Sequence, residues 1–565
     1  MSIQFTDFSF KYWALQQPTL KNINLTINKG EKVVIVGPSG SGKSTLGQCL
    51  NGLIPFSVKG DITGSLKING KETQQMDLHQ CTSMVGTVLQ DTDGQFVGLS
   101  IGEDIAFALE NQMIAPGPMR QVVEETAAMM DLDDMLHLSP FDLSGGQKQR
   151  VSLAGVMVDD VDILLFDEPL ASLDPKTGKS TIEIIDRLHR ETGKTVVIIE
   201  HRLEDVLHCH ADRIILMERG EIVANMTPDE LLASPLLVQH GIREPLYLSA
   251  LKAAGCDIDQ ADKPAYLSTL DIARFKPQVL NWFQQSDMVT AESKEAPLLE
   301  VKNLSYSYDN QRQTLDGVSF TVNQGEFVSI LGKNGSGKST ITRLIMGVLE
   351  PDSGSICFEG HDLAARSIFE RSQDIGIVLQ NPNHMISHHM IFDEVASGLR
   401  NRGVPESEVE AKVLETLKLC GLDRYRHWPI DALSYGQKKR VTIATILVLE
   451  PKLLILDEPT AGQDYHHYTA MMGFIKELNQ KLGITILIIS HDMHLVLEYT
   501  QRAIVIADSK LLADSAVNEV FSQPALLEQA NLTVTSLYTL ASSLGIERID
   551  HFIRCFINHE AGSLS

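Results

Sequence analysis

The sequence has few cysteines, and they form no recognisable pattern. Seven lie scattered among 565 residues, an odd number, and none belongs to a Cys-x-x-Cys pair. Disulfide frameworks need paired cysteines, and structural zinc sites need closely spaced ones. We therefore predict reduced, buried thiols in a cytosolic protein.

Long apolar runs are also missing. The longest, such as 196–199 and 484–489, fall far short of the ~20 residues that a membrane-spanning helix needs. The first residues show no basic segment followed by an apolar one, so we predict no signal peptide and no direct membrane insertion.

Basic residues are scarce relative to acidic ones. The chain has 48 lysines and arginines against 73 aspartates and glutamates, which gives a formal net charge of −25. A surface this acidic is repelled by phosphate backbones, so nucleic acid is disfavoured as a partner. It suits basic patches on other proteins instead. The length alone allows about three to five domains.

The sequence contains an internal repeat. The segment 37–45 recurs 295 residues later as 332–340, and later motifs recur at a spacing of 290. Because the spacing falls once, the first copy carries about five extra residues within 54–63. A constant spacing over such a length indicates a duplicated domain.

Each copy alternates strand-like and helix-like segments. Short apolar runs ending in a glycine-rich loop or an acidic residue predict buried parallel strands. These predicted strands are 31–36, 163–166 and 195–199 in the first copy and 327–331, 453–456 and 485–489 in the second. The alternation predicts an α/β fold with a mostly parallel sheet, whose ligands collect at the carboxyl edge.

A glycine-rich loop follows the first of these strands in each copy. Gly-x-x-x-x-Gly-Lys-Ser after a strand is the P-loop pattern, in which backbone N–H groups surround a phosphate. The lysine would contact the β- and γ-phosphates, and the serine would ligate Mg²⁺. The predicted loop residues are Gly37, Ser39, Gly40, Gly42, Lys43, Ser44 and Thr45, and Gly332, Asn334, Gly335, Gly337, Lys338, Ser339 and Thr340.

An aspartate ends a later apolar strand in each copy. Asp167 and Asp457 supply the kind of oxygen that Mg²⁺ prefers, and each is followed directly by a glutamate. The loop and the aspartate together predict a bound phosphate group with Mg²⁺.

These motifs resemble the ATP-binding cassette family over almost the full length of both copies. The segment 143–147, Leu-Ser-Gly-Gly-Gln, is similar to the signature motif of that family and lies between a Val-Leu-Gln segment and an Asp-Glu strand end. The resemblance implies two P-loop domains in tandem, each with an antiparallel β subdomain and a helical subdomain. It also implies that the bound phosphates are those of ATP, and each ATP would lie between the P-loop of one domain and the signature of the other.

The resemblance also implies roles for single residues. The catalytic carboxylate that polarises the attacking water, and the histidine at the γ-phosphate, would be Glu168 with His201 and Glu458 with His491. Gln90 and Gln380 resemble the Q-loop residues that ligate Mg²⁺ and sense a membrane partner.

Further residues would complete the two nucleotide sites. Tyr12 and Tyr308 would stack on adenine. Ser434 and Gly436 would complete the site at Lys43, and Ser144 and Gly146 the site at Lys338.

The second copy departs from the family pattern in two places. Its signature has Tyr435 where the first glycine is expected, but it keeps the serine and the second glycine. Its segment 461–464 reads Ala-Gly-Gln-Asp, where 171–174 of the first copy read Ala-Ser-Leu-Asp. We expect both sites to be competent, with room for unequal turnover.

The stretch 90–111 is similar to energy-coupling-factor importers. These take up vitamins, vitamin precursors such as the thiamine pyrimidine, or transition-metal ions such as cobalt. They use a transmembrane coupling subunit and a small substrate-binding membrane protein, which we expect as partners. The chain would then lie peripherally on the cytoplasmic face of a bacterial membrane. No residue identifies the substrate.

Four acidic residues follow the predicted Q-loops: Glu103, Asp104, Asp393 and Glu394. We expect them to line a groove that suits basic coupling helices. The alternative is that they cap the N-terminus of a helix, where carboxylates are favoured in any case.

Two other functions stay open at this point. A soluble tandem cassette acting on ribosomes would need basic surfaces, whereas the segment 243–297 is acidic on balance and interrupted by prolines. A tandem sugar-importer ATPase would tend to show a degenerate second half.

The predicted domains are a cassette at 1–242, its helical extension at 243–285, a linker at 286–297, a second cassette at 298–520 and its helical extension at 521–565.

Overall fold

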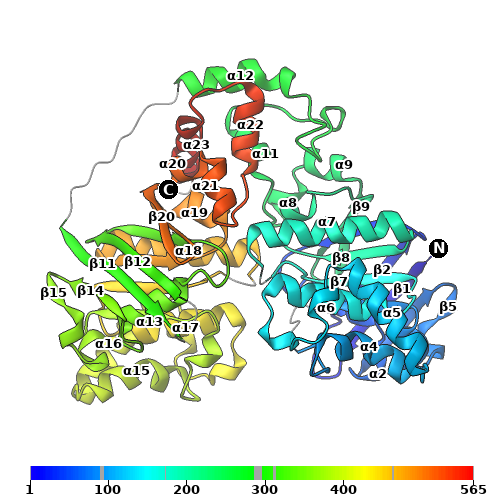
Figure 1. Cartoon of the computed structure of the whole chain (residues 1–565), viewed down its shortest axis with the longest axis horizontal. Coiled ribbons are helices and arrows are strands. Elements are labelled where there is room, and N and C mark those ends of the chain that lie inside the picture. The colour runs from blue at the N-terminus through cyan, green and yellow to red at the C-terminus, as the bar shows by residue number, and fades with distance from the viewer. Residues whose placement is uncertain are drawn as a thin grey trace. The chain divides into compact units, whose positions relative to one another are not determined.

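The chain folds into two compact units with the same order of strands (Figure 1). The computed structural model describes residues 2–89, 94–171, 173–285, 296–308, 313–460 and 463–563. The units are Met1–Phe275 with Asp464–His466, and Lys276–Gln463 with His467–Ser565. Most of the predicted linker, 286–295, lies outside the described residues.

Each unit begins with a four-stranded antiparallel sheet. The strands of the first unit are β1 (Ile3–Tyr12), β2 (Leu20–Ile27), β4 (Gly60–Ile68) and β5 (Lys71–Glu72). Those of the second unit are β11 (Pro297–Ser307), β12 (Gln313–Asn323), β14 (Ser353–Phe358) and β15 (His361–Asp362). The strand orders, β2-β1-β4-β5 and β12-β11-β14-β15, are the same.

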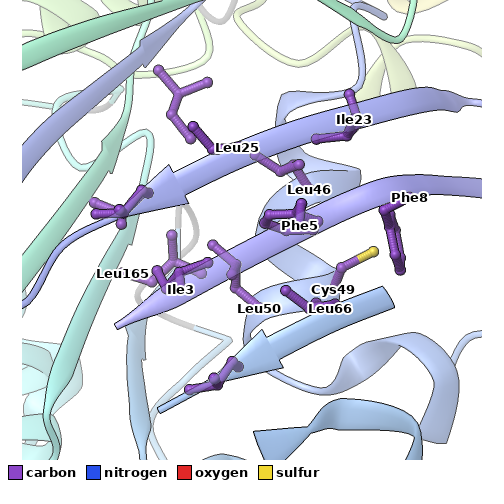
Figure 2. Close-up of a cluster of buried hydrophobic side chains, with 14 of the residues drawn as sticks. Ile3, Phe5, Phe8, Ile23, Leu25, Leu46, Cys49, Leu50, Leu66 and Leu165 are labelled. Atoms are coloured by element: carbon purple, nitrogen blue, oxygen red, sulfur yellow. The ribbon is translucent and has the colours of Figure 1, made fainter. Parts of the chain in front are cut away.

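Alternate apolar residues of this sheet form one face of the core. Figure 2 shows Ile3 and Phe5 of β1 and Leu25 of β2 in the cluster that also includes Leu46 and Leu50 of α1 (Lys43–Leu50). All five side chains are buried. This packing fixes the helix that follows the glycine-rich loop against the antiparallel sheet.

The second sheet of each unit has six strands. In the first unit these are β3 (Lys32–Val36), β6 (Val85–Val88), β7 (Ile163–Asp167), β8 (Thr195–Ile199), β9 (Arg213–Glu218) and β10 (Glu221–Met226). In the second unit they are β13 (Phe327–Leu331), β16 (Ile375–Val378), β17 (Leu453–Asp457), β18 (Thr485–Ile489), β19 (Arg502–Ala507) and β20 (Lys510–Ala516).

The six-stranded sheets are parallel except at one edge. The order is β10-β9-β3-β8-β7-β6 in the first unit and β20-β19-β13-β18-β17-β16 in the second, with only β10 and β20 antiparallel to their neighbours. Every residue of β3, β8, β13 and β18 is buried, as expected for parallel strands covered on both faces. The predicted α/β fold is confirmed.

Helices cover these sheets, and Figure 1 shows α4, α5 and α6 grouped together. The helices of the first unit are α1, α2 (Leu53–Phe56), α3 (Leu78–Thr82), α4 (Ile101–Asn111), α5 (Pro116–Met129), α6 (Gly145–Met157), α7 (Pro175–Thr192), α8 (Leu203–Val206), α9 (Pro228–Ala233), α10 (Leu236–Gln239) and α11 (Leu246–Ala253), followed by α12 (Ile272–Gln285). Those of the second unit are α13 (Lys338–Met346), α14 (Ile368–Arg371), α15 (Ile391–Asn401), α16 (Glu406–Leu419), α17 (Tyr435–Leu447), α18 (Tyr465–Leu482), α19 (Met493–Tyr499), α20 (Val517–Phe521), α21 (Pro524–Gln529), α22 (Ser536–Leu544) and α23 (Ile549–Ser563).

The extra residues of the first copy build a local addition. They lie in α2 and in the longer β4, which has nine residues where β14 has six.

The cysteines are mostly buried as expected, but Cys209 and Cys357 are only half-buried.

A buried ion pair distinguishes the first unit from the second. Lys32 of β3 lies 2.8 Å from Asp186 of α7, and the lysine side chain is almost fully enclosed. At the equivalent positions the second unit has Phe327 and Lys476. An ion pair therefore occupies a place that a phenylalanine fills in the copy.

We predict that Asp186→Ala lowers the opening free energy of β3 and β8 by about 3–5 kcal/mol, because it leaves Lys32 buried without its partner. Native-state hydrogen exchange of peptides from these strands measures this free energy. Lys32→Phe combined with Asp186→Lys should cost less than Asp186→Ala alone. Equal costs would contradict the account.

Candidate functional site

The candidate site of each unit lies at the carboxyl edge of the six-stranded sheet. In the first unit β3, β8 and β7 are neighbours, so the segments that follow them meet at one edge. Their registers pair Ile35 with Ile199 and Asp167 with Ile199, and the Glu168 N–H donates to the Ile199 carbonyl at 2.8 Å. The predicted loop, the Asp-Glu pair and the histidine therefore converge.

The second unit repeats this arrangement. Its neighbouring strands are β13, β18 and β17, and Ile489 pairs with both Ile330 and Asp457. The Glu458 N–H donates to the Ile489 carbonyl at 2.9 Å. The same predicted residue types therefore meet at the edge of both sheets.

Each glycine-rich loop is closed around its own lysine. The Lys43 ammonium donates to the carbonyls of Gly37 at 2.8 Å and Pro38 at 2.9 Å. Lys338 does the same with Gly332 and Lys333, both at 2.8 Å. Burial lowers the pKa of Lys43 to about 8, against the opposing charge of Glu168 and other carboxylates. A buried ammonium held by loop carbonyls is well suited to meet an added anion.

The first glycine of each loop leaves no room for a side chain. A Cβ on Gly37 would lie 2.2 Å from the Met217 carbonyl oxygen, and one on Gly332 would lie 1.9 Å from that of Ile506. Gly42, at the start of α1, has φ of 98°, which disfavours other residues. The loop can therefore hold its N–H groups around a phosphate only with glycine here.

A serine and an aspartate face each other beside each loop. Ser44 Oγ donates to Asp167 Oδ1 at 3.5 Å, and Ser339 Oγ donates to Asp457 Oδ2 at the same distance. Burial, followed by the charge of Glu168, raises the pKa of Asp167 to about 6, and the pKa of Asp457 is raised in the same way. A nearby cation would offset this cost, and hydroxyl and carboxylate oxygens are the donors that Mg²⁺ takes.

The glutamate next to each aspartate pairs with the predicted histidine. His201 Nε2 lies 3.0 Å from Glu168 Oε1, and His491 Nδ1 lies 2.7 Å from Glu458 Oε1. Burial opposes ionisation of Glu168, but the hydrogen bond and charge of His201 hold its pKa below the usual value. Both glutamates have a left-handed backbone, φ 50° and 47°, a strain that clusters at functional sites.

The two predicted adenine-stacking tyrosines lie beside the first turn of the following helix. Tyr12 Oη is 3.0 Å from Thr45 Oγ1 and donates to Gln48 at 3.2 Å. Tyr308 Oη is 3.3 Å from Thr340 Oγ1 and accepts from Arg343 at 3.1 Å. These contacts fix the hydroxyl ends, and stacking on adenine stays a prediction.

The signature residues stand at the start of a helix in each unit. Ser144 caps α6 and Ser434 caps α17, each through a capping box with the glutamine three residues later. A Cβ on Gly146 would meet the Thr177 methyl at 2.4 Å. The N–H groups of such a helix start can hold an anion, but its placement against the other P-loop stays a prediction. Gln90 lies outside the described residues, whereas Gln380 is described and exposed.

Sequence reasoning missed one residue at this edge. Glu200 follows β8 directly, is buried, and accepts hydrogen bonds from the N–H groups of Leu170 and His201. An acidic residue directly after an apolar strand was the available signal, as it was for Asp167. The second unit has Ser490 at this position.

The expected acidic groove is wrong in part. Glu394 is buried and accepts from the N–H groups of Ser387 and His388 at 2.9 and 2.7 Å. Glu103 forms a capping box with Ser100 at the start of α4. The capping alternative is thus confirmed for Glu103, and the buried Glu394 cannot present charge to a partner.

The remaining two acidic residues also have partners within their own unit. Asp104 accepts from the N–H groups of Val97 and Gly98, and Asp393 lies 3.0 Å from Arg400. Asp104 therefore orders the segment that leads into α4, and Asp393 is paired within α15.

Comparison with known sequences decides the family. Residues 20–171 and 315–461, together more than half of the chain, match the family described as ABC transporter. The chain belongs to the ABC transporter family. It is an ATP-binding component with two cassettes, and cassettes of this family are ATPases coupled to transport.

Relatives extend over the whole chain. An ABC transporter ATP-binding protein of Photobacterium profundum is 78% identical over 561 residues, 99% of this chain and 100% of the relative. One of Vibrio vulnificus is 68% identical over 563 residues, covering 100% and 98%. One of Clostridium perfringens is 53% identical over 561 residues, covering 99% of each.

Two more specific similarities accompany these relatives. Residues 234–306 match the family described as ATP-binding cassette cobalt transporter. The structure of cbiO1 from Clostridium perfringens, part of the ABC transporter complex cbiONQ, is 34% identical, covers 46% of this chain and all of its own, and gives a TM-score of 0.40. In the described part of the chain, no helix has the length and apolarity needed to cross a membrane.

We predict that Gly37→Ala weakens nucleotide binding to the first unit by more than about tenfold, since its Cβ would clash with backbone that cannot move aside. A fluorescent ATP analogue measures the affinity in a Lys338→Ala background, which isolates the first loop. Gly117→Ala is the matched control, because a Cβ there meets nothing within 4 Å. Unchanged affinity in Gly37→Ala would contradict the assignment.

Proposed function

We propose that both units bind Mg·ATP and hydrolyse it with the residues predicted from the sequence. One observation supports this. In each unit the glycine-rich loop with its lysine, a serine–aspartate pair and a glutamate–histidine pair meet at the carboxyl edge of the six-stranded sheet. Mg²⁺, held by Ser44 with Asp167 and by Ser339 with Asp457, would neutralise charge on the phosphates.

The proposed chemistry uses positioning and charge. Lys43, released from its loop carbonyls, would bind the β- and γ-phosphate oxygens. Glu168 would accept a hydrogen bond from the attacking water and align it with the γ-phosphorus, and His201 would hold that carboxylate in place. Lys338, Glu458 and His491 would act in the same way in the second unit.

We further propose that hydrolysis energises import of a small molecule through an energy-coupling-factor complex. The supports are the similarity of residues 90–111 to such importers and the match of residues 234–306 to the cobalt transporter family. Among the substrates left open by the sequence, this match favours the cobalt ion. The partners would be a transmembrane coupling subunit and a small substrate-binding membrane protein, with this chain on the cytoplasmic face.

An exposed apolar surface is the proposed docking site for the coupling subunit on the first unit. Val97 and Leu99 precede α4, Phe107 lies on it, and all three are exposed, Leu99 by 84%. Phe141 is also exposed and packs edge-on against Phe96, with ring centroids 6.2 Å apart. Since the nearby acidic residues serve the fold, apolar contact carries more of this docking than charge.

We predict that Glu168→Gln with Glu458→Gln lowers the ATP turnover number by about a hundredfold or more, because both water-orienting carboxylates are lost. Nucleotide binding should remain, since the loops are untouched. Phosphate release by the purified complex measures turnover, and exposed Glu221→Gln is the control. Unchanged turnover would show that the role assignment is wrong.

We predict that Leu99→Asp with Phe107→Asp releases the membrane partners while ATP binding stays intact, since charge would be placed in an apolar contact. Co-purification in detergent with the tagged chain measures this. Met113→Asp is the matched control, because Met113 is 92% exposed but lies beyond the far end of α4. Retention of the partners by the double variant would exclude this surface.

A further inference from the structure

Two side chains of α17 contact the backbone that follows β16. The Tyr435 hydroxyl donates to the Gln380 carbonyl at 3.2 Å. The Lys439 ammonium donates to the Leu379 carbonyl at 3.0 Å and to that of Gln380. Residues four apart share one helix face, and a carbonyl oxygen can accept two hydrogen bonds. Both donors therefore act on one short stretch of backbone.

The first unit has different residues at both positions. Gly145 replaces the tyrosine and has no side chain to donate. Gln149 replaces the lysine, and its buried amide donates to the carbonyl of Pro169 instead. Two of the differences between α6 and α17 thus concern the same acceptors in the second unit.

Lys439 is enclosed to a degree unusual for a lysine. Its side chain is only 1% exposed. A buried ammonium is costly unless it is hydrogen-bonded and close to opposite charge. Burial lowers the pKa of Lys439 to about 8, while the charges of Asp457 and Glu458 at the end of β17 act to raise it. The ammonium is therefore held by the carbonyls of Leu379 and Gln380 and lies close enough to Asp457 and Glu458 to be affected by their charge.

We propose that Tyr435 and Lys439 clamp the Q-loop backbone of the second unit onto α17, so that Gln380 and the signature residues at the start of α17 move as one body. The link is direct, because Ser434 caps the helix that carries both donors. What this motion would accomplish rests on the proposed function, in which Gln380 senses the partner and Ser434 contacts ATP. In this proposal Tyr435 and Lys439 are positioning residues that act through the backbone they hold.

The clamp gives a physical role to the departure of the second signature from the family pattern. A glycine at position 435 would leave Lys439 as the one contact from α17 to these carbonyls among the hydrogen bonds described. The tyrosine adds a second contact four residues nearer the helix start, and two contacts on one face resist rotation of the loop about either one.

Hydrogen exchange of the full-length chain without nucleotide tests the clamp. The segment after Gln380 contains protected amides, since the N–H groups of His384 and Met385 donate to carbonyls within it at 3.2 and 3.0 Å. Lys439→Gln should make residues 379–386 exchange about tenfold faster, the size expected for losing hydrogen bonds from a charged donor. Tyr435→Phe, which removes one hydroxyl from a half-exposed side chain, should act in the same direction to a smaller extent.

Lys438→Gln is the matched control for this experiment. It removes the same charge from the neighbouring position, but the Lys438 ammonium lies 3.8 Å from Asp431 and makes no described contact with Gln380. Its exchange should equal that of the parent chain. Unchanged exchange in both Lys439→Gln and Tyr435→Phe would overturn the clamp.

A kinetic measurement tests the positioning role. In a Glu168→Gln background, where the turnover that remains depends on Glu458, Lys439→Gln should lower kcat by about tenfold with KM for ATP unchanged. Faster exchange with unchanged kcat would overturn this role. If the chain hydrolyses no ATP at all, the proposed function fails, and the exchange experiment still decides the clamp.

Discussion

The register of three adjacent parallel strands is the constraint on which both sites depend. In each unit the central strand ends in an isoleucine, Ile199 or Ile489, that pairs with residues of the strands on both sides. The loop, the acidic pair and the histidine are far apart in sequence, yet each leaves the sheet at the same level. A slip of one residue would turn every side chain of a strand to the opposite face and separate these groups.

The two units are more alike at the carboxyl edge of the six-stranded sheet, where the candidate phosphate-binding residues lie, than in the residues around it. The serine–aspartate distance is 3.5 Å in both units, and the lysine–carbonyl distances agree within 0.1 Å. The differences lie among residues next to this edge. Glu200 of the first unit is replaced by Ser490 in the second, and Gln149 is replaced by Lys439. These residues hold the segments that carry the candidate catalytic groups, so they are where two similar sites can acquire different behaviour.

Much of this could be predicted because the relevant signals are local. The strand β13 begins and ends where its apolar run does, and the residues after β3 carry the whole loop pattern. Long-range contacts gave no such signal. A capping glutamate and a partner-binding glutamate look alike in sequence, so the buried Glu394 was wrongly expected in an open groove. Lys439 lies on a helix where a lysine normally reaches solvent, and only its contact with the Q-loop explains its burial.

The central claim is that one sheet-edge geometry, built twice, makes two nucleotide sites of the same kind. Calorimetric titration of the Glu168→Gln, Glu458→Gln chain with Mg·ATP tests it most directly, because bound nucleotide is then not consumed. The account predicts one ATP bound by each unit, with the stoichiometry falling by half when Lys43 or Lys338 is replaced by alanine. Binding to a single unit, or a stoichiometry that neither lysine changes, would contradict it.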